Sequence, residues 1–161
     1  MDRTDFSVAD DDRWMDEALA EARAAVAHDD VPIGAVVVRA GKVIGRGRNR
    51  REVDHDPTAH AEILALREAA RALGRWRLDD CAMYVTLEPC AMCAGAAVLA
   101  RLALVVFGAP DEKAGAVRSV AELLDEPRLN HHPRWRLGVR RAEAEALLSG
   151  FFAGRRYDRG P

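Results

Sequence analysis

The sequence lacks several features that would assign it to a whole class of proteins. None of its apolar runs approaches the roughly 20 residues that a membrane-spanning helix needs. The chain contains only three cysteines, and this odd number argues against the disulfide framework of a small secreted domain. The acidic, polar start of the chain does not have the form of a secretory signal. We therefore expect a cytoplasmic protein.

An excess of charge of one sign is lacking as well. The formal net charge is −2 at pH 7, which argues weakly against a nucleic-acid partner. The charge is unevenly spread, because residues 1–12 contain five Asp and one Arg, whereas residues 155–159 contain three Arg and one Asp. The basic end of the chain is compatible with contacts to phosphate groups but does not require them.

Length and composition indicate one globular domain. Of the 161 residues, 49% are hydrophobic and 31% are charged, as in folded rather than disordered chains. No internal repeat, low-complexity segment or linker divides the chain. We predict a disordered acidic leader over residues 1–11 and a single domain over residues 12–159.

The periodicity of apolar residues predicts alternating helices and strands. Helices are expected at residues 11–28, 60–73, 90–101 and 142–157, with a short helix at 119–124. Strands are expected at residues 32–39, 42–47, 81–87, 102–107 and 134–140. This order predicts an α/β fold, a three-layer α-β-α sandwich around a mixed five-stranded sheet. Ligands in such folds bind beyond the carboxyl ends of the strands.

Two short motifs carry the chemistry that the sequence indicates. One is H-A-E at residues 60–62, and the other is P-C-x-x-C at residues 89–93. Either motif alone is weak, because an isolated C-x-x-C can be a redox pair and an isolated histidine is usually structural. Together, with one predicted strand between them, they match the signature of zinc-dependent nucleobase deaminases.

The spacing of these residues suits one Zn²⁺ ion. Cys90 and Cys93 are three residues apart and share a helix face, in a first turn where the helix dipole favours thiolates. His60 supplies a third ligand, which leaves the fourth position of a tetrahedral ion open for the water of a catalytic site. Glu62 would move protons without binding the metal. This requires His60 to lie at the very start of its helix, since residues two apart do not share a face of a regular helix.

Other interpretations of the motifs remain open at this point. A structural zinc site would need a fourth protein ligand, for which the sequence offers Cys81, His28, His55, His131 and His132. Cys81 precedes an apolar run and is expected to be a small buried residue instead. A thioredoxin-like redox pair would belong after the first strand of a βαβ unit, which is not where this pair lies. A zinc-stabilised RNA-binding module without catalytic activity is a further alternative.

Segments well beyond the motifs resemble the bacterial tRNA-specific adenosine deaminases of the cytidine deaminase-like superfamily. The resemblance is carried by residues 55–62 (HDPTAHAE) and 85–95 (VTLEPCAMCAG), and also by residues 31–36, 48–50, 106–109, 111–115 and 147–152. The metal motif alone is shared with cytidine, deoxycytidylate and guanine deaminases, so the flanking segments favour the tRNA enzymes.

The resemblance implies a cytidine deaminase-like fold, one Zn²⁺ per subunit and a homodimer. It also implies an activity, the hydrolytic conversion of adenosine to inosine by zinc-activated water at the wobble position of the tRNA anticodon, with arginine tRNA as the expected substrate. Deamination of guanine or another free nucleobase is the alternative within the same fold.

The same resemblance implies roles for residues around the metal. Asn49 would hydrogen-bond the flipped purine, although an Asn in this place also closes turns. The Ala61 backbone N–H would hold the exocyclic oxygen of the product. Asp111 would contact a ribose 2′-hydroxyl, unless it is a solvated loop residue.

The last predicted helix would lie against the anticodon stem-loop. Phe152 would stack on the RNA or rim the pocket, and Arg155 and Arg156 would contact the RNA. The chain lacks possible phosphate contacts of well-known relatives at three positions, Pro110, Ala114 and Ala153. These departures concern the strength of RNA binding rather than the chemistry.

Overall fold

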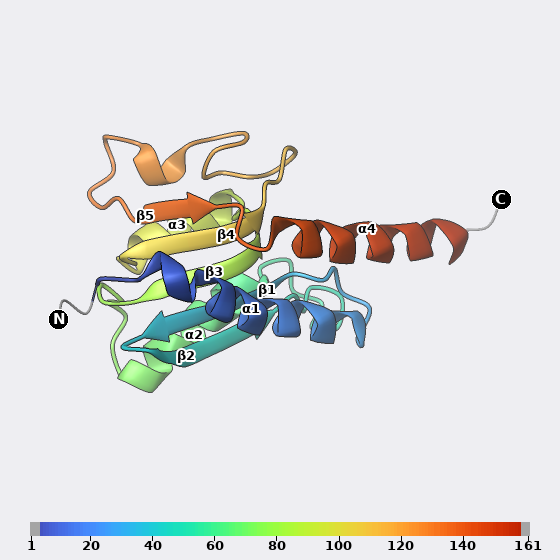
Figure 1. Ribbon diagram of the computed structural model, residues 1–161, viewed down its shortest axis with the longest axis horizontal. Coiled ribbons are helices and arrows are strands. Elements are labelled where there is room, and N and C mark those ends of the chain that lie inside the picture. Colours follow the sequence, from blue (N-terminus) through green and yellow to red (C-terminus); the bar gives the residue numbers. More distant parts are fainter. Residues whose placement is uncertain (1–3, 159–161) are drawn as a thin grey trace.

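The computed structural model describes residues 4–158, and the side chains of residues 4–155 (Figure 1). The helices are α1 (Asp11–Val26), α2 (Ala61–Leu73), α3 (Ala91–Leu99) and α4 (Arg141–Asp158), with short 3₁₀ turns at Val8–Asp10 and Leu123–Asp125. The strands are β1 (Gly34–Arg39), β2 (Lys42–Arg48), β3 (Ala82–Leu87), β4 (Leu104–Ala109) and β5 (Arg134–Leu137). None of the described helices is long and apolar enough to cross a lipid bilayer.

The five strands form one mixed sheet, as predicted, in the order β2-β1-β3-β4-β5. β1 is antiparallel to both β2 and β3, whereas β3, β4 and β5 are parallel. β2 therefore runs in the same direction as β3 and β4. The carboxyl ends of these three strands open at one edge of the sheet, where the segments that follow them carry Asn49, Cys90 and Asp111.

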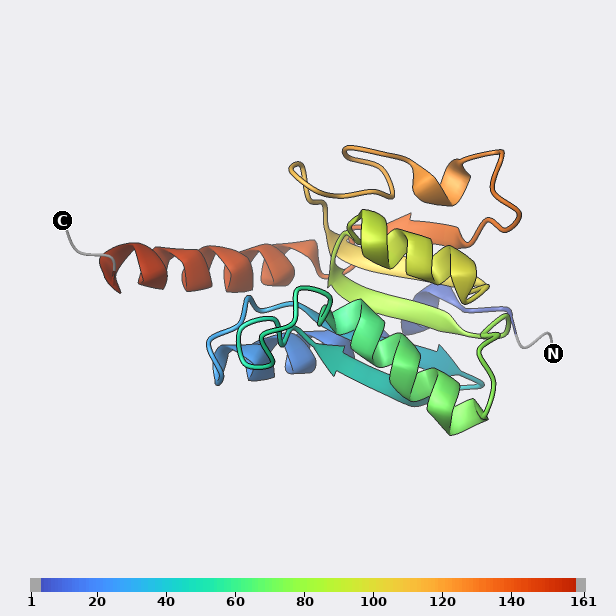
Figure 2. The same cartoon turned by 180° about the vertical axis from the view of Figure 1, so that it is seen from behind.

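Helices cover both faces of the sheet and complete the predicted three layers. α1 and α4 lie on the face seen in Figure 1, and α2 and α3 lie on the face seen in Figure 2. Alternate residues of β1 point to opposite sides, so that Val36 and Val38 pack with α1, whereas Val37 packs with α2 and α3. β3 and β4 are buried on both faces, which explains their nearly continuous apolar sequences.

Glycine in β2 sets the distance between α2 and the sheet. A Cβ atom added to Gly47 would lie 2.0 Å from the Ala61 carbonyl oxygen, and one added to Gly45 would lie 2.3 Å from the Ala65 carbonyl oxygen. Only a residue without a side chain allows the helix backbone to approach so closely. The first turn of α2 therefore rests directly on β2.

The prediction of a disordered leader over residues 1–11 is wrong for residues 4–11, while residues 1–3 lie outside the described residues. Asp11 begins α1 and is 3% exposed. Its carboxylate accepts hydrogen bonds from the Tyr84 hydroxyl at 3.0 Å and from the Arg136 guanidinium at 2.6 and 2.8 Å. Phe6 packs against the same core. The acidic run resembles a solvated tail in sequence, but these contacts to β3 and β5 offset the entropic cost of ordering it.

The other corrections to the predicted elements are local. Residues 119–124 do not form a helix, and only Leu123–Asp125 adopts a short 3₁₀ turn there. The ends of the remaining helices and strands differ from the predicted ends by three residues or fewer. Differences of this size arise because periodicity identifies the body of an element better than its ends.

Candidate active site

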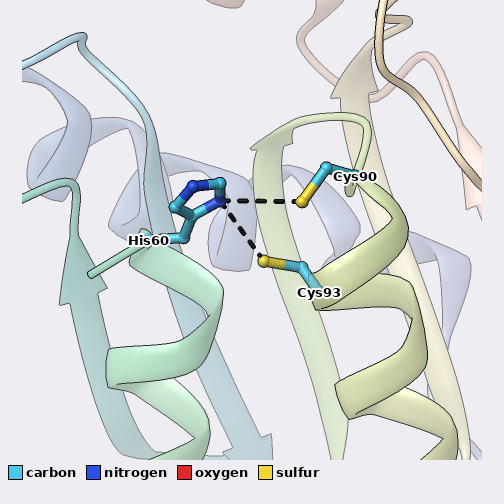
Figure 3. A group of neighbouring side chains, drawn as sticks. All are labelled: His60, Cys90 and Cys93. Atoms are coloured by element: carbon cyan, nitrogen blue, oxygen red, sulfur yellow. Dashed lines mark hydrogen bonds between the residues drawn. The ribbon is translucent and has the colours of Figure 1, made fainter. Parts of the chain in front are cut away.

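Three potential metal ligands meet where α2 and α3 begin (Figure 3). His60 is the N-cap of α2, Cys90 is the N-cap of α3, and Cys93 lies in the first turn of α3. The His60 Nδ1 atom is 3.7 Å from the Cys90 Sγ and 3.5 Å from the Cys93 Sγ. All three ligand atoms lie within 4.8 Å of one another, and the side chains point toward one another between the two helices.

The spacing of these atoms fits a zinc ion. Zinc binds thiolate sulfur at about 2.3 Å and imidazole nitrogen at about 2.0–2.1 Å, so two such ligands in tetrahedral geometry lie roughly 3.6 Å apart. The two nitrogen–sulfur distances agree with this value. No fourth His, Cys, Asp or Glu among the described residues joins the group. A zinc ion held by this group would therefore keep one tetrahedral position free of protein ligands, as in catalytic rather than structural zinc sites.

The alternative fourth ligands lie elsewhere. Cys81 precedes β3 and Cys90 follows it, so a six-residue strand, roughly 20 Å long, separates them. Cys81 is fully buried, as predicted, and burial raises the pKa of its thiol to about 12. Three histidines are bonded to oxygen atoms elsewhere in the chain, namely His28, His131 and His132. His55 is exposed and lies outside the group.

The three side chains influence one another's protonation. Hydrogen bonding with Cys93 and with His60 lowers the pKa of Cys90, and the positive end of the α3 dipole acts in the same direction. The hydrogen bond with Cys90, together with burial, raises the pKa of Cys93. The hydrogen bond with Cys90 also raises the pKa of His60. Metal ligation requires deprotonated thiols and a neutral imidazole, so a metal entering this group would displace the shared protons.

Glu62 lies beside the ligand group without belonging to it. It is the second residue of α2, is 4% exposed, and lines the adjoining cavity. The backbone of His60 is extended, with φ −79° and ψ 149°, so that regular helix begins only at Ala61. The condition that His60 lies at the very start of its helix is thus confirmed. Burial raises the pKa of Glu62 above the ordinary value of a glutamate.

Asn49 follows β2 and faces the start of α2. It is 2% exposed, and its Oδ1 atom accepts a hydrogen bond from the Ala61 N–H at 3.1 Å. This bond satisfies one of the free N–H groups at the helix start. The Asn49 amide N–H groups therefore remain available to donate hydrogen bonds to a ligand in the cavity. A ligand oxygen at the Ala61 N–H would have to share or replace the bond to Asn49.

The ligand group opens into a cavity of about 500 Å³, a size typical of small-molecule sites. The cavity lies beyond the carboxyl ends of β2, β3 and β4, where the α/β architecture predicts a ligand site. Its walls combine the metal group with loop residues and one side of α4. The lining residues are Val31, Ile33, Asn49, Arg51, His60, Glu62, Leu87, Glu88, Cys90, Pro110, Asp111, Glu112, Lys113, Ala114, Leu148 and Phe152.

Glu88, to which sequence reasoning gave no role, organises the loop after β4. It is 2% exposed, and its Oε2 atom accepts hydrogen bonds from the backbone N–H groups of Val117, Arg118 and Ser119 at 2.9–3.2 Å. Its Oε1 atom accepts from the Asp111 N–H and the Ser119 hydroxyl. Burial would raise the pKa of this carboxyl, but the hydrogen bonds outweigh burial and lower it. A glutamate at a strand end directly before P-C is the one sequence signal of this role.

Asp111 lines the cavity from that same loop. Its Oδ1 atom accepts hydrogen bonds from the backbone N–H groups of Lys113 and Ala114, at 3.1 and 3.2 Å. Asp111 therefore shapes the loop in addition to facing the cavity. The described residues give no hydrogen bond to its Oδ2 atom, which remains for a ligand.

α4 forms one side of the cavity mouth. Phe152 lines the cavity, is 47% exposed, and makes an edge contact with Phe151, with the ring centroids 5.4 Å apart. The Arg155 guanidinium bonds to Asp29 in the loop after α1. The side chain of Arg156 lies outside the described residues.

Most of the chain is similar to deaminases. A family model for MafB19-like deaminases matches residues 9–156. The tRNA-specific adenosine deaminase of Bacillus subtilis (strain 168) is 49% identical over 142 residues, which cover 88% of each chain. The tRNA-specific adenosine deaminase of Aquifex aeolicus (strain VF5) is 49% identical over 139 residues, 86% of this chain and 91% of that one. The chain belongs to the tRNA-specific adenosine deaminase family.

Solved structures agree with membership of the tRNA-specific adenosine deaminase family. A structure from studies of A-to-I editing by tRNA:A34 deaminases at the wobble position of transfer RNA matches with a TM-score of 0.82 and 46% identity, over 84% of this chain and 99% of that one. A guanine deaminase from Nitrosomonas europaea matches with a TM-score of 0.77 and 28% identity, over 88% and 84% of the two chains. The resemblance and the fold inferred from the sequence are thereby confirmed.

Two of the three positions at which the resemblance implies missing phosphate contacts lie at the cavity. Pro110 and Ala114 line it, whereas Ala153 is exposed on α4. Arg51 and Lys113 are the Arg and Lys side chains among the lining residues. Positive charge at the cavity mouth is therefore present but is carried by few side chains.

Proposed function

We propose that this chain is a hydrolase that converts adenosine to inosine at the wobble position of the tRNA anticodon, with arginine tRNA as the expected substrate and one Zn²⁺ per subunit. The observation that carries the proposal is the three-ligand group of His60, Cys90 and Cys93, which opens into a cavity beside the buried Glu62. It is supported by two relatives, each 49% identical, that are tRNA-specific adenosine deaminases.

The reaction replaces the amino group of adenine with oxygen, consuming water and releasing ammonia. Zinc held by His60, Cys90 and Cys93 would supply Lewis-acid activation of water near neutral pH. Glu62 moves the protons. Its carboxylate accepts one proton as water adds to C6 and delivers it to the ring nitrogen N1. The remaining proton of the new C6 hydroxyl then passes through Glu62 to the amino group, the C6–N bond breaks, and ammonia leaves.

Asn49 and Ala61 are the residues that we assign to hydrogen bonding with the edge of the purine base. Since the Asn49 Oδ1 atom already accepts the Ala61 N–H at 3.1 Å, we assign the Asn49 amide N–H to an acceptor on the flipped base. The product oxygen would reach the Ala61 N–H by sharing or replacing that bond. Flipping is least costly for a base in a loop, which fits an anticodon substrate.

Residues at the rim of the cavity would contact the RNA on either side of the target base. The Oδ2 atom of Asp111 would accept a ribose 2′-hydroxyl, which distinguishes RNA from DNA. The exposed ring of Phe152 would offer a stacking surface to an unpaired base. Arg156 is assigned to phosphate from the resemblance alone. A homodimer remains a prediction from the resemblance, and a cytoplasmic location remains a prediction from the sequence.

The proposal is tested by offering the zinc-loaded protein three substrates in parallel. They are an arginine anticodon stem-loop RNA with adenosine at the wobble position, the same RNA with that adenosine replaced by guanosine, and free guanine. Inosine is measured by nucleoside digestion and mass spectrometry, and ammonia by a coupled assay. We expect inosine from the first RNA only. Ammonia from guanine without inosine in the RNA would replace the proposal with the free-base alternative, which the similarity to guanine deaminases at 28% identity keeps in view.

A further inference from the structure

Two elements that are distant in sequence contribute side by side to the lining of the cavity. Val31 contributes from the loop between α1 and β1, and Leu148 and Phe152 contribute from α4. The ribbon views show that the later turns of α4 extend beyond the edge of the sheet, alongside the end of α1 (Figures 1 and 2). The sheet does not support this part of α4, so its position depends on contacts with the α1–β1 loop.

Arg155 makes those contacts. Its Nη2 atom donates to the Asp29 carbonyl oxygen at 2.6 Å and lies 2.9 Å from the Asp29 Oδ2 atom. The guanidinium carbon lies 4.5 Å from the centroid of the Phe151 ring, within cation–π range. The Nε atom is buried and has no partner among the described residues. The guanidinium is therefore held between Asp29 and the Phe151 ring, although 32% of the Arg155 side chain remains exposed.

Asp29 is a suitable anchor for this cation. It lies just beyond the end of α1, where the exposed helix carbonyls carry negative partial charge. The next residue, Asp30, is buried, and its carboxylate accepts hydrogen bonds from the backbone N–H groups of Glu52 and Val53 at 3.0 and 3.4 Å. The loop that receives Arg155 is thus fixed to the segment that follows Asn49.

We propose that Arg155 is a positioning residue, which clasps α4 to Asp29 and so holds Phe152 at the cavity mouth, and that it is not a phosphate ligand. Arg155 acts on the substrate only through α4. The kinetic test of this inference rests on the proposed function, because it uses the proposed RNA substrate. The prediction from the resemblance, in which Arg155 contacts the RNA, is the competing account.

The two accounts predict opposite effects of removing the Asp29 charge. A clasp loses its anchor in Asp29→Asn, so KM for the anticodon stem-loop rises, whereas a phosphate ligand is released from a competing carboxylate and KM falls or stays constant. Asparagine tolerates the left-handed backbone of residue 29, whose φ is 64°, so the substitution does not strain the loop.

The experiment compares the wild type with Arg155→Gln, Asp29→Asn and the double variant, and with Arg155→Lys as the conservative change. Arg141→Gln is the matched control, since it also removes one cation from α4, where Arg141 pairs with Glu145. We expect each single variant to raise KM roughly fivefold, the scale of one exposed ion pair, at unchanged kcat. The double variant should equal the singles, Arg155→Lys should restore part of the loss, and Arg141→Gln should have no effect.

Salt dependence and hydrogen exchange complete the test. Loss of a phosphate contact would lower the slope of log affinity against log salt by about one, whereas loss of the clasp leaves the slope unchanged. Hydrogen exchange of the peptide covering residues 145–155 should accelerate in both single variants. This readout needs no activity, so it tests the clasp even if the proposed substrate is wrong. A constant or lower KM in Asp29→Asn, additive effects in the double variant, or unchanged exchange would overturn the inference.

Discussion

His60 illustrates how one backbone position determines the chemistry of the site. Because it is an N-cap with extended backbone, its ring leaves α2 at the first turn and reaches the two sulfur atoms at the start of α3. Glu62, two residues later, still faces the same cavity. In the middle of a helix the same two residues would lie on different faces. The division of labour between ligand and proton carrier thus depends on where the helix begins.

Glu62→Gln should strongly slow deamination while leaving the metal site and the fold intact. Glutamine keeps the shape of the side chain but cannot accept a proton, and general acid–base groups contribute typically 10²–10⁴-fold to a rate. We therefore expect kcat to fall at least about 10²-fold, with zinc content and melting temperature close to those of the wild type. Inosine formation, metal analysis and thermal unfolding check the prediction. Loss of zinc in this variant would instead make Glu62 a ligand and contradict its assigned role.

The metal ligands could be predicted from the sequence, but the residues that hold the surrounding loops and α4 in place could not. The metal ligands stand at helix starts, where spacing and residue type are both informative. Glu88 could not be assigned, because its partners are backbone N–H groups some 30 residues further along the chain, and backbone partners leave no residue-type signal. The RNA contact of Arg155 was predicted from the resemblance, and its partner Asp29 could not be foreseen because it lies 126 residues away.

At the scale of elements, the site depends on how closely α2 approaches β2. Gly47→Ala would place a Cβ atom 2.0 Å from the Ala61 carbonyl oxygen and would push the first turn of α2 away from the sheet. Overpacking of this kind typically lowers the free energy of unfolding by about 1–3 kcal/mol. Because the clash is with a backbone atom, we expect a loss of about 3 kcal/mol. His60 would move with the helix, so zinc affinity should fall as well. Thermal unfolding and zinc titration measure the two effects.

Gly95→Ala is the matched control for that substitution. A Cβ atom at Gly95, in α3, would meet nothing within 4 Å, and alanine is the better helix former by up to about 1 kcal/mol. The control should therefore be neutral or stabilising and should bind zinc normally. Equal behaviour of the two variants would show that the close approach of α2 to β2 does not hold the metal site.

The loop after β4 depends on Glu88 in a comparable way. In Glu88→Gln the amide NH₂ would face backbone N–H groups that now bond to a carboxylate oxygen, leaving buried donors unpaired. We expect a loss of about 2–3 kcal/mol in unfolding free energy and a higher KM, because Asp111 belongs to the same loop. Urea unfolding and steady-state kinetics check both. The exposed Glu122, with no side-chain cap bond, gives the control Glu122→Gln, which should change neither quantity.

At the scale of the whole molecule, the order of the four long helices and the five strands was predictable from their apolar residues, whereas the short helix predicted at residues 119–124 does not form. The ordered structure of the N-terminal residues was not predictable, because an acidic run gives no sign of a buried partner. Asp11 receives hydrogen bonds from β3 and β5, strands that follow it by more than 70 residues. One buried carboxylate therefore connects the first helix to the middle and the far edge of the sheet.

Arg136→Leu should destabilise the molecule globally, since it leaves the Asp11 carboxylate, with only 5% of its side chain exposed, without its cationic partner. Breaking a buried ion pair from one side costs about 3 kcal/mol or more. Urea unfolding measures the loss. Arg128→Leu removes an arginine that is 89% exposed in its pair with Glu126 and should give an unfolding curve like that of the wild type. If the two variants unfold alike, the Asp11 cluster does not anchor the N-terminal residues.

The central claim is that three protein ligands hold one zinc ion and leave its fourth position open to the cavity. X-ray absorption at the zinc edge of the purified protein tests this most directly. The account predicts two sulfur neighbours at about 2.3 Å and two nitrogen or oxygen neighbours at about 2.0–2.1 Å, one of which exchanges with added small anions. A third sulfur, a fourth neighbour that no added ligand displaces, or a protein that retains no zinc would contradict it.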